Sequence, residues 1–218
     1  ELDTETGGMD YVFLMDISGS MSAQGKLVQS VSTVQSFLDA LGERDRFEVV
    51  TFSSVPDLHF GTMTEVNDAS KKSARDYLAS QKARGGTVLR PALQTAYKYR
   101  DSDRPLNVVL LSDGMTEFGE HTELVRLIEQ APDGVRVFCV GIGNEVNRPL
   151  LKQLAEGAGG LAAFVSQEDD FERQAQLFRR KLMRPAAAEV KIDLADAEIY
   201  DVTPRERSEE HTSELQSQ

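Results

Sequence analysis

The sequence predicts an α/β fold: a doubly wound, mostly parallel six-stranded sheet with one short antiparallel edge strand and helices on both faces. Two observations predict it. Apolar runs such as 11–15 and 108–111 show no alternation with polar residues, which is typical of strands covered on both faces. Segments with helical spacing separate these runs, and strands that alternate with helices imply right-handed crossovers. With 218 residues, 40% of them hydrophobic, the chain is long enough to bury a full core.

The elements of the first half follow from hydrophobic periodicity. Residues 11–15 form the first predicted strand, and residues 46–53 form the second. Residues 58–60, before Gly61, predict a short edge strand that is antiparallel to its neighbour. Between the first two strands lies a predicted helix, which Gly42 ends and whose apolar residues recur at helical spacing: Leu27, Val28, Val31, Val34, Leu38 and Leu41.

The second half alternates in the same way. Pro91 falls in the first turn of a predicted helix, where its missing N–H is harmless, and Pro132 ends a later helix. The predicted helices are 67–82, 90–100, 122–131, 147–157 and 168–183, and the predicted strands are 107–112, 135–141 and 161–165.

Composition divides the chain into three parts. Residues 1–184 carry the alternating pattern and are predicted to form one domain. Within residues 185–206, the segment 189–194 alternates with period two, which predicts the truncated start of a following β-rich element. Residues 207–218 are polar and resemble the translation of a sequencing adaptor, so we expect a disordered tail that is not native to the protein.

Three short segments far apart in the chain carry oxygen-bearing side chains beside predicted strand or helix ends. They are Asp16-Ile17-Ser18-Gly19-Ser20, Gly85-Gly86-Thr87 and Leu111-Ser112-Asp113-Gly114. The carboxyl ends of parallel strands form the ligand crevice of an open α/β sheet, so we expect these segments to meet. Three hydroxyls and two carboxylates suit Mg²⁺, with Mn²⁺ or Ca²⁺ as alternatives, and suit zinc or copper poorly. The predicted metal ligands are Asp16, Ser18, Ser20, Thr87 and Asp113.

Each segment also has a simpler interpretation. Ser18 and Ser20 could cap the following helix, and Asp113 with Gly114 could form a turn. Three such coincidences at one sheet edge favour the metal site. The predicted rim of the site consists of Met21, Ser22, Met115, Thr116 and Glu117.

At these residues the chain resembles the von Willebrand factor type A domain. The metal-ion-dependent adhesion site of that family is written D-x-S-x-S, then a Thr, then D-G after a later strand, and all five ligand positions match. The resemblance covers roughly residues 8–184. Other matching segments, including Val140-Gly141-Ile142-Gly143 and Arg184-Pro185, are similar to inter-alpha-trypsin inhibitor heavy chains and to bacterial proteins that join a vault/inter-alpha-trypsin domain to this one.

The resemblance implies a binding module whose bound cation takes an Asp or Glu carboxylate from another protein. It implies an extracytoplasmic protein that is periplasmic, at the cell surface or secreted, with any signal sequence upstream of this chain. One alternative is an intracellular subunit that docks on an ATPase or chelatase partner. A metal-dependent hydrolase is disfavoured because no Lys, His or Arg accompanies the three motifs and Ser18 has no evident base. We therefore expect no enzymatic activity.

Charge and composition exclude several partners. The net charge of −12 argues against nucleic acid and against anionic membrane surfaces. No apolar stretch approaches the roughly 18 residues of a membrane span, so we expect no direct membrane insertion. Cys139 lies in an apolar run and is expected to be a small buried hydrophobe. His59 and His121 have no second His or Cys at metal-binding spacing and are expected to be structural or exposed.

Overall fold

The central sheet of this computed structural model contains more strands than the sequence predicts. The structure describes residues 8–101, 103–116 and 119–165. Within them, seven strands form one sheet in the order β3-β2-β1-β5-β6-β7, with β4 also paired to β2. The strands are β1 (Asp10–Asp16), β2 (Arg46–Phe52), β3 (Pro56–Leu58), β4 (Thr64–Glu65), β5 (Leu106–Ser112), β6 (Val135–Ile142) and β7 (Ala162–Val165).

The parallel core of the sheet confirms the predicted fold, and its edge corrects the strand count. β1 pairs in parallel with β2 and β5, and β5, β6 and β7 continue the parallel sheet. Both β3 and β4 pair antiparallel to β2. The prediction of six strands with one antiparallel strand was wrong in one respect, because it missed the second antiparallel strand, β4. Its two residues carry no periodicity of their own, so only their pairing with Arg46 and Phe47 makes them a strand.

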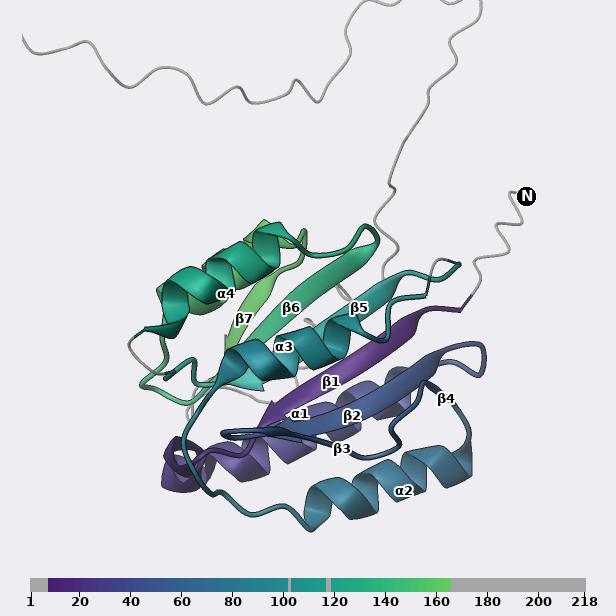
Figure 1. Cartoon of the computed structure of the whole chain (residues 1–218). Coiled ribbons are helices and arrows are strands. Elements are labelled where there is room, and N and C mark those ends of the chain that lie inside the picture. The colour runs from purple at the N-terminus through teal and green to yellow at the C-terminus, as the bar shows by residue number, and fades with distance from the viewer. Residues whose placement is uncertain (1–7, 102, 117–118, 166–218) are drawn as a thin grey trace, which may run out of the picture. The chain divides into compact units, whose positions relative to one another are not determined.

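Helices connect the strands and cover both faces of the sheet (Figure 1). A 3₁₀ segment, η1 (Gly19–Gly25), leads from β1 into the first helix. The α-helices of the described residues are α1 (Lys26–Ala40), α2 (Asp68–Ala79), α3 (Leu89–Tyr97), α4 (Glu120–Glu129) and α5 (Arg148–Gly157). Apart from shifts of one to three residues at their ends, these are the predicted helices.

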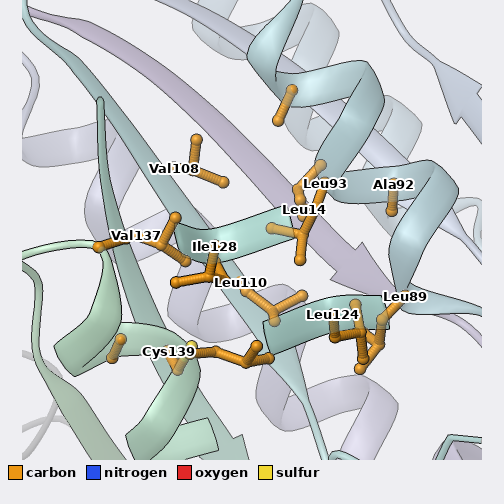
Figure 2. Packing of buried hydrophobic residues seen from close by; sticks show 14 of the residues in the cluster. Leu14, Leu89, Ala92, Leu93, Val108, Leu110, Leu124, Ile128, Val137 and Cys139 are labelled. Carbon is orange, nitrogen blue, oxygen red and sulfur yellow. The ribbon is translucent and has the colours of Figure 1, made fainter. Parts of the chain in front are cut away.

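The core consists of two hydrophobic layers, one on each face of the sheet. Alternate residues of each central strand point to opposite faces, so Phe13 packs with α1 and α2 while Leu14 packs with α3, α4 and α5. Figure 2 shows the second layer, where Leu14 and Leu110 of the sheet lie among helical side chains that include Leu93. Cys139 belongs to this layer, and burial raises the pKa of its thiol. Its predicted role as a buried hydrophobe is confirmed.

The first helix buries most of its predicted apolar stripe: Val34, Leu38 and Leu41 are buried, and Leu27 and Val31 pack against the core. The buried face of α1 includes Lys26, Ser30, Val34, Phe37 and Leu38. Val28, which the periodicity assigns to the core, is instead 70% exposed. Hydrophobicity alone misses the buried polar residues of this face, such as Lys26 and Ser30.

Several predictions fall outside the described residues. These are the helix at 168–183, the β-rich element within 185–206, the tail at 207–218, and the domain boundary after residue 184. They stay predictions.

Candidate metal centre

The three motif segments meet where the strand order reverses. After β1 the chain builds β2 on one side, and it later adds β5 on the other side of β1. The carboxyl ends of β1 and β5 are neighbours, because Met15 pairs with Leu111. Open α/β sheets bind ligands at this kind of switch point. The topology therefore brings Asp16 and Asp113 to the same crevice.

Asp16 is a buried carboxylate with hydrogen bonds to both of its oxygens. Its Oδ1 accepts a bond of 2.8 Å from the backbone N–H of Ser18, and its Oδ2 accepts one of 2.6 Å from the hydroxyl of Ser112. Burial raises the pKa of Asp16, the charge of Asp113 raises it further, and these hydrogen bonds oppose the rise. None of the described side chains forms a salt bridge with Asp16. The ionised carboxylate is consequently short of compensating positive charge.

Ser18 and Ser20 present their hydroxyls to each other in the loop after β1. Their Oγ atoms lie 3.1 Å apart, and Ser18 is fully buried. Ser18 occupies the cap position of η1, but its side chain makes no capping hydrogen bond there. The capping alternative for Ser18 is therefore wrong, and its hydroxyl faces the same loop as the second serine.

The loop that carries Thr87 is fastened to the loop after β1 by backbone hydrogen bonds. Arg84 N–H donates to the carbonyl of Ile17 at 2.7 Å, and Gly19 N–H donates to the carbonyl of Gly85 at 3.0 Å. Gly85 has a φ of 73°, and a Cβ there would come within 3.3 Å of the Ser53 hydroxyl, so a glycine suits this position. The contacts bring Thr87, which is itself buried, to the same edge of the sheet as the serines.

Asp113 lies in a turn that follows β5. Its Oδ1 accepts a hydrogen bond of 3.0 Å from the backbone N–H of Met115, and Gly114 has a φ of 71°. The turn proposed as the simpler alternative is thus present, and the carboxylate still lies at the crevice. A Cβ on Gly114 would come within 3.1 Å of Asn147 Cβ at the start of α5, which explains the glycine.

A lysine accompanies the motifs, contrary to the sequence-based expectation that no Lys, His or Arg does so. The ammonium Nζ of Lys26 lies 3.0 Å from Asp113 Oδ2, and both side chains are almost completely buried. The sequence pattern does not predict this contact, because Lys26 and Asp113 are 87 positions apart and only the fold brings them together. Helical spacing could have indicated that Lys26 is buried, since it lies on the same face of α1 as Val34 and Phe37.

The predicted rim is only partly at the surface. Met21 is fully buried in the core, so its assignment to the rim was wrong. Ser22 is exposed, and its hydroxyl donates to the carbonyl of Gly19 at 2.7 Å. Met115 is 45% exposed. Thr116 is half-buried, and Glu117 lies outside the described residues.

Glu120 is a structural residue beside the site that sequence reasoning missed. The first turn of α3 follows Thr87, and its cap residue Val88 provides no side-chain acceptor. Glu120 supplies one from α4: its carboxylate accepts the backbone N–H groups of Leu89 at 3.1 Å and Arg90 at 2.6 Å. Thr116 donates its hydroxyl to the same carboxylate. Glu120 therefore holds the helix that begins just after the Thr87 loop.

Replacing Glu120 with alanine is expected to lower the free energy of unfolding by about 1 to 2 kcal/mol, because two helix N–H groups lose their acceptor. Urea denaturation monitored by circular dichroism measures the change. Glu123→Ala is the matched control, since Glu123 pairs with Arg90 only at the exposed surface, and it should cost less than about 1 kcal/mol. Equal effects of the two variants would contradict this role of Glu120.

The donor set at the crevice fits a hard divalent cation. Hydroxyl and carboxylate oxygens are the ligands that Mg²⁺, Mn²⁺ and Ca²⁺ prefer. The described residues contain no cluster of three or more His, Cys, Asp or Glu side chains that could hold a metal by themselves. A cation here must therefore draw on serine and threonine hydroxyls in addition to Asp16 and Asp113. The buried, uncompensated charge of Asp16 is the feature that most favours a bound cation.

Comparison with known proteins identifies relatives of the domain. The profile of the family described as von Willebrand factor type A domain matches residues 9–164. Inter-alpha-trypsin inhibitor heavy chain H4 of Homo sapiens is 28% identical over 204 residues, which covers 88% of this chain and 22% of that protein. The chain spans 9% to 22% of the length of this and two similar relatives from Dictyostelium discoideum.

Solved structures share the fold. A von Willebrand factor type A protein from Catenulispora acidiphila superposes with a TM-score of 0.71 at 22% identity, covering 80% of this chain and 42% of that chain. Proximal thread matrix protein 1 from the mussel byssus, in a structure described as having a zinc-occupied MIDAS motif, gives a TM-score of 0.65 at 20% identity. That match covers 80% of this chain and 46% of the mussel chain.

Proposed function

The chain belongs to the von Willebrand factor type A domain family, and from this premise we propose that it is a metal-dependent protein-binding module. The proposed ligands of a single divalent cation, Mg²⁺ with Mn²⁺ or Ca²⁺ as alternatives, are Asp16, Ser18, Ser20, Thr87 and Asp113. When bound, the cation would supply an open coordination position for an Asp or Glu carboxylate of a partner protein. The protein residues hold and orient that cation without turning over a substrate.

The uncompensated charge of Asp16 is the observation that carries this proposal. A carboxylate buried without a salt bridge is costly unless a cation balances it. Two carboxylates with three neutral hydroxyls would leave a divalent cation able to attract a further anionic ligand. The surface charge favours the same mechanism, because a chain with a net charge of −12 repels an acidic partner unless a local cation attracts it.

The surroundings of Ser18 favour binding over catalysis. A nucleophilic serine needs an adjacent base to take its proton. The Ser18 hydroxyl contacts the hydroxyl of Ser20, which is not a base, and the carboxylate of Asp16, which is itself a proposed metal ligand. Lys26 Nζ donates to Asp113 and is engaged in that ion pair.

The likeness to inter-alpha-trypsin inhibitor heavy chain H4 supports an extracytoplasmic location and a role as part of a larger protein. No helix in the described ranges combines the length and the apolar character that crossing a bilayer requires. The mussel byssus protein described with zinc at its MIDAS motif supports metal occupancy of the equivalent site. We therefore propose a periplasmic, cell-surface or secreted protein whose partner presents an acidic side chain.

Water-proton relaxation with Mn²⁺ tests both the cation site and its open position. Mn²⁺ bound at an open site keeps exchangeable water, so we expect the wild-type domain to enhance relaxation and added acetate to reduce that enhancement. Thr87→Ala should lower both the enhancement and the acetate effect. Thr64→Ala is the matched control. Thr64 pairs with Phe47 near the start of β2, away from the proposed cation site, so this variant should change neither the enhancement nor the acetate effect.

Two outcomes would contradict the proposal. If the wild-type domain gives no enhancement of water-proton relaxation at millimolar Mn²⁺, the proposed cation site is wrong. Metal-dependent hydrolysis of p-nitrophenyl phosphate or p-nitrophenyl acetate that is abolished by Ser18→Ala would move the chain to an enzymatic class.

A further inference from the structure

Lys26 is an almost fully buried lysine that points into the proposed metal site. It is 5% exposed, and its Nζ lies 3.0 Å from Asp113 Oδ2. Lysine is almost never buried to this extent unless its charge is paired. The fold makes room for this side chain, which packs beside Gly143 directly after β6. A Cβ on Gly143 would come within 2.6 Å of Lys26 Cε, so a larger residue there would force the lysine side chain to shift.

We propose that Lys26 is a positioning residue of the metal site: its ammonium group balances Asp113 before a cation binds, and it limits the affinity of the site for that cation. The inference rests on the proposed function and assigns a role to a residue outside the five proposed ligands.

The first part of this role follows from the pairing of the two buried carboxylates. Asp16 and Asp113 lie close enough for the charge of one to act on the other. Of the two, Asp113 has a salt bridge and Asp16 has none within the described residues. Without Lys26, the described side chains would leave two buried carboxylates at this edge of the sheet with no salt-bridge partner. The ammonium group therefore keeps the start of α1 and the loop after β5 together in the absence of metal.

The second part follows from the occupied oxygens of Asp113. Oδ1 accepts the N–H of Met115 and Oδ2 accepts the ammonium of Lys26. A divalent cation attracted to this carboxylate meets a fixed positive charge in hydrogen-bond contact with it, and like charges at such separations repel. Lys26 thus lowers the affinity for the cation, which makes metal binding readily reversible.

Lys26→Met tests both parts, because methionine removes the charge and keeps a long unbranched side chain. By calorimetry, we expect Lys26→Met to bind Mn²⁺ at least about tenfold more tightly than the wild type. In EDTA the variant should melt several degrees lower. Mn²⁺ should then raise its melting temperature more than it raises that of the wild type. Lys72→Met is the matched control, since it removes the same charge from a side chain that is 75% exposed, and it should alter neither quantity.

A second variant separates this inference from the proposed function. In EDTA, Asp113→Asn added to Lys26→Met should restore part of the lost melting temperature, because the uncompensated carboxylate is gone. An unchanged melting temperature of Lys26→Met would overturn the first part, and Mn²⁺ affinity equal to or below that of the wild type would overturn the second. If neither protein binds Mn²⁺, the proposed function and the second part fail together, and the EDTA measurements alone decide the first part.

Lys26→Met can also be judged if it does not fold in EDTA. Refolding in Mn²⁺ then tests whether the metal cation can replace the missing ammonium group. Recovery of native circular dichroism in Mn²⁺ supports the inference, and failure to recover overturns it.

Discussion

Asp16→Asn is expected to weaken Mn²⁺ binding by at least about a hundredfold, while the metal-free domain stays as stable as the wild type or becomes more stable. The loss of affinity follows from removing one of two carboxylate charges at the site, an effect of several kcal/mol for close charges. Asparagine preserves the local geometry. Its Oδ1 can accept the N–H of Ser18, and its amide can donate to the hydroxyl of Ser112.

The stability half of this prediction depends on the burial of Asp16. Burial raises the pKa of Asp16, which means that the folded protein without metal disfavours the ionised form. A neutral isostere removes that cost. Isothermal calorimetry gives the affinity, and thermal unfolding in EDTA gives the stability.

A distant aspartate provides the control for net charge. Asp133→Asn changes the total charge equally at an exposed position before β6, so it should leave Mn²⁺ affinity unchanged. If Asp16→Asn binds Mn²⁺ as tightly as Asp133→Asn does, Asp16 is not a ligand of the metal. A large loss of metal-free stability would show that the carboxylate charge is structural.

Asp10→Asn is expected to lower the free energy of unfolding by about 3 kcal/mol and to leave Mn²⁺ affinity unchanged. Asp10 begins β1, as Asp16 ends it, and both are fully buried. Arg46 donates to Asp10 from Nε at 2.9 Å and from Nη2 at 2.6 Å, and Arg104 Nε donates at 2.8 Å. The substitution leaves two guanidinium groups beside a neutral amide. Because both arginines are about a quarter exposed, water offsets part of the loss.

Chemical denaturation compares Asp10→Asn with a surface control. Asp101→Asn removes the second carboxylate on Arg46, at 3.1 Å and 41% exposed, and should cost less than about 1 kcal/mol. A strand of seven residues separates Asp10 from the metal site by about 20 Å, so metal affinity should not respond. A small stability loss for Asp10→Asn, similar to that of the control, would contradict the buried ion-pair role.

The two aspartates show how far a motif can be interpreted without a structure. Both border the same apolar run, and nothing local distinguishes them except the serines after Asp16. The structure separates them by their partners. Asp10 meets Arg46, which is the first residue of the neighbouring strand, and Arg104, which precedes β5. Among the residues that the structure describes, the hydrogen-bond donors to Asp16 are neutral. Pairing between distant segments is set by strand order, which no local pattern contains.

Local sequence patterns predict the parallel strands, most of the helices and the five candidate ligands, because each depends on residues that are adjacent or periodic along the chain. Apolar runs predict β1 and β5, and D-x-S-x-S places Asp16, Ser18 and Ser20 in one loop. Local patterns do not predict the presence of β4, the burial of Met21, or the contacts of Glu120 with α3 and of Lys26 with Asp113. These features arise when segments 17 to 87 residues apart are packed together, and their energies depend on burial and charge that exist only in the folded chain.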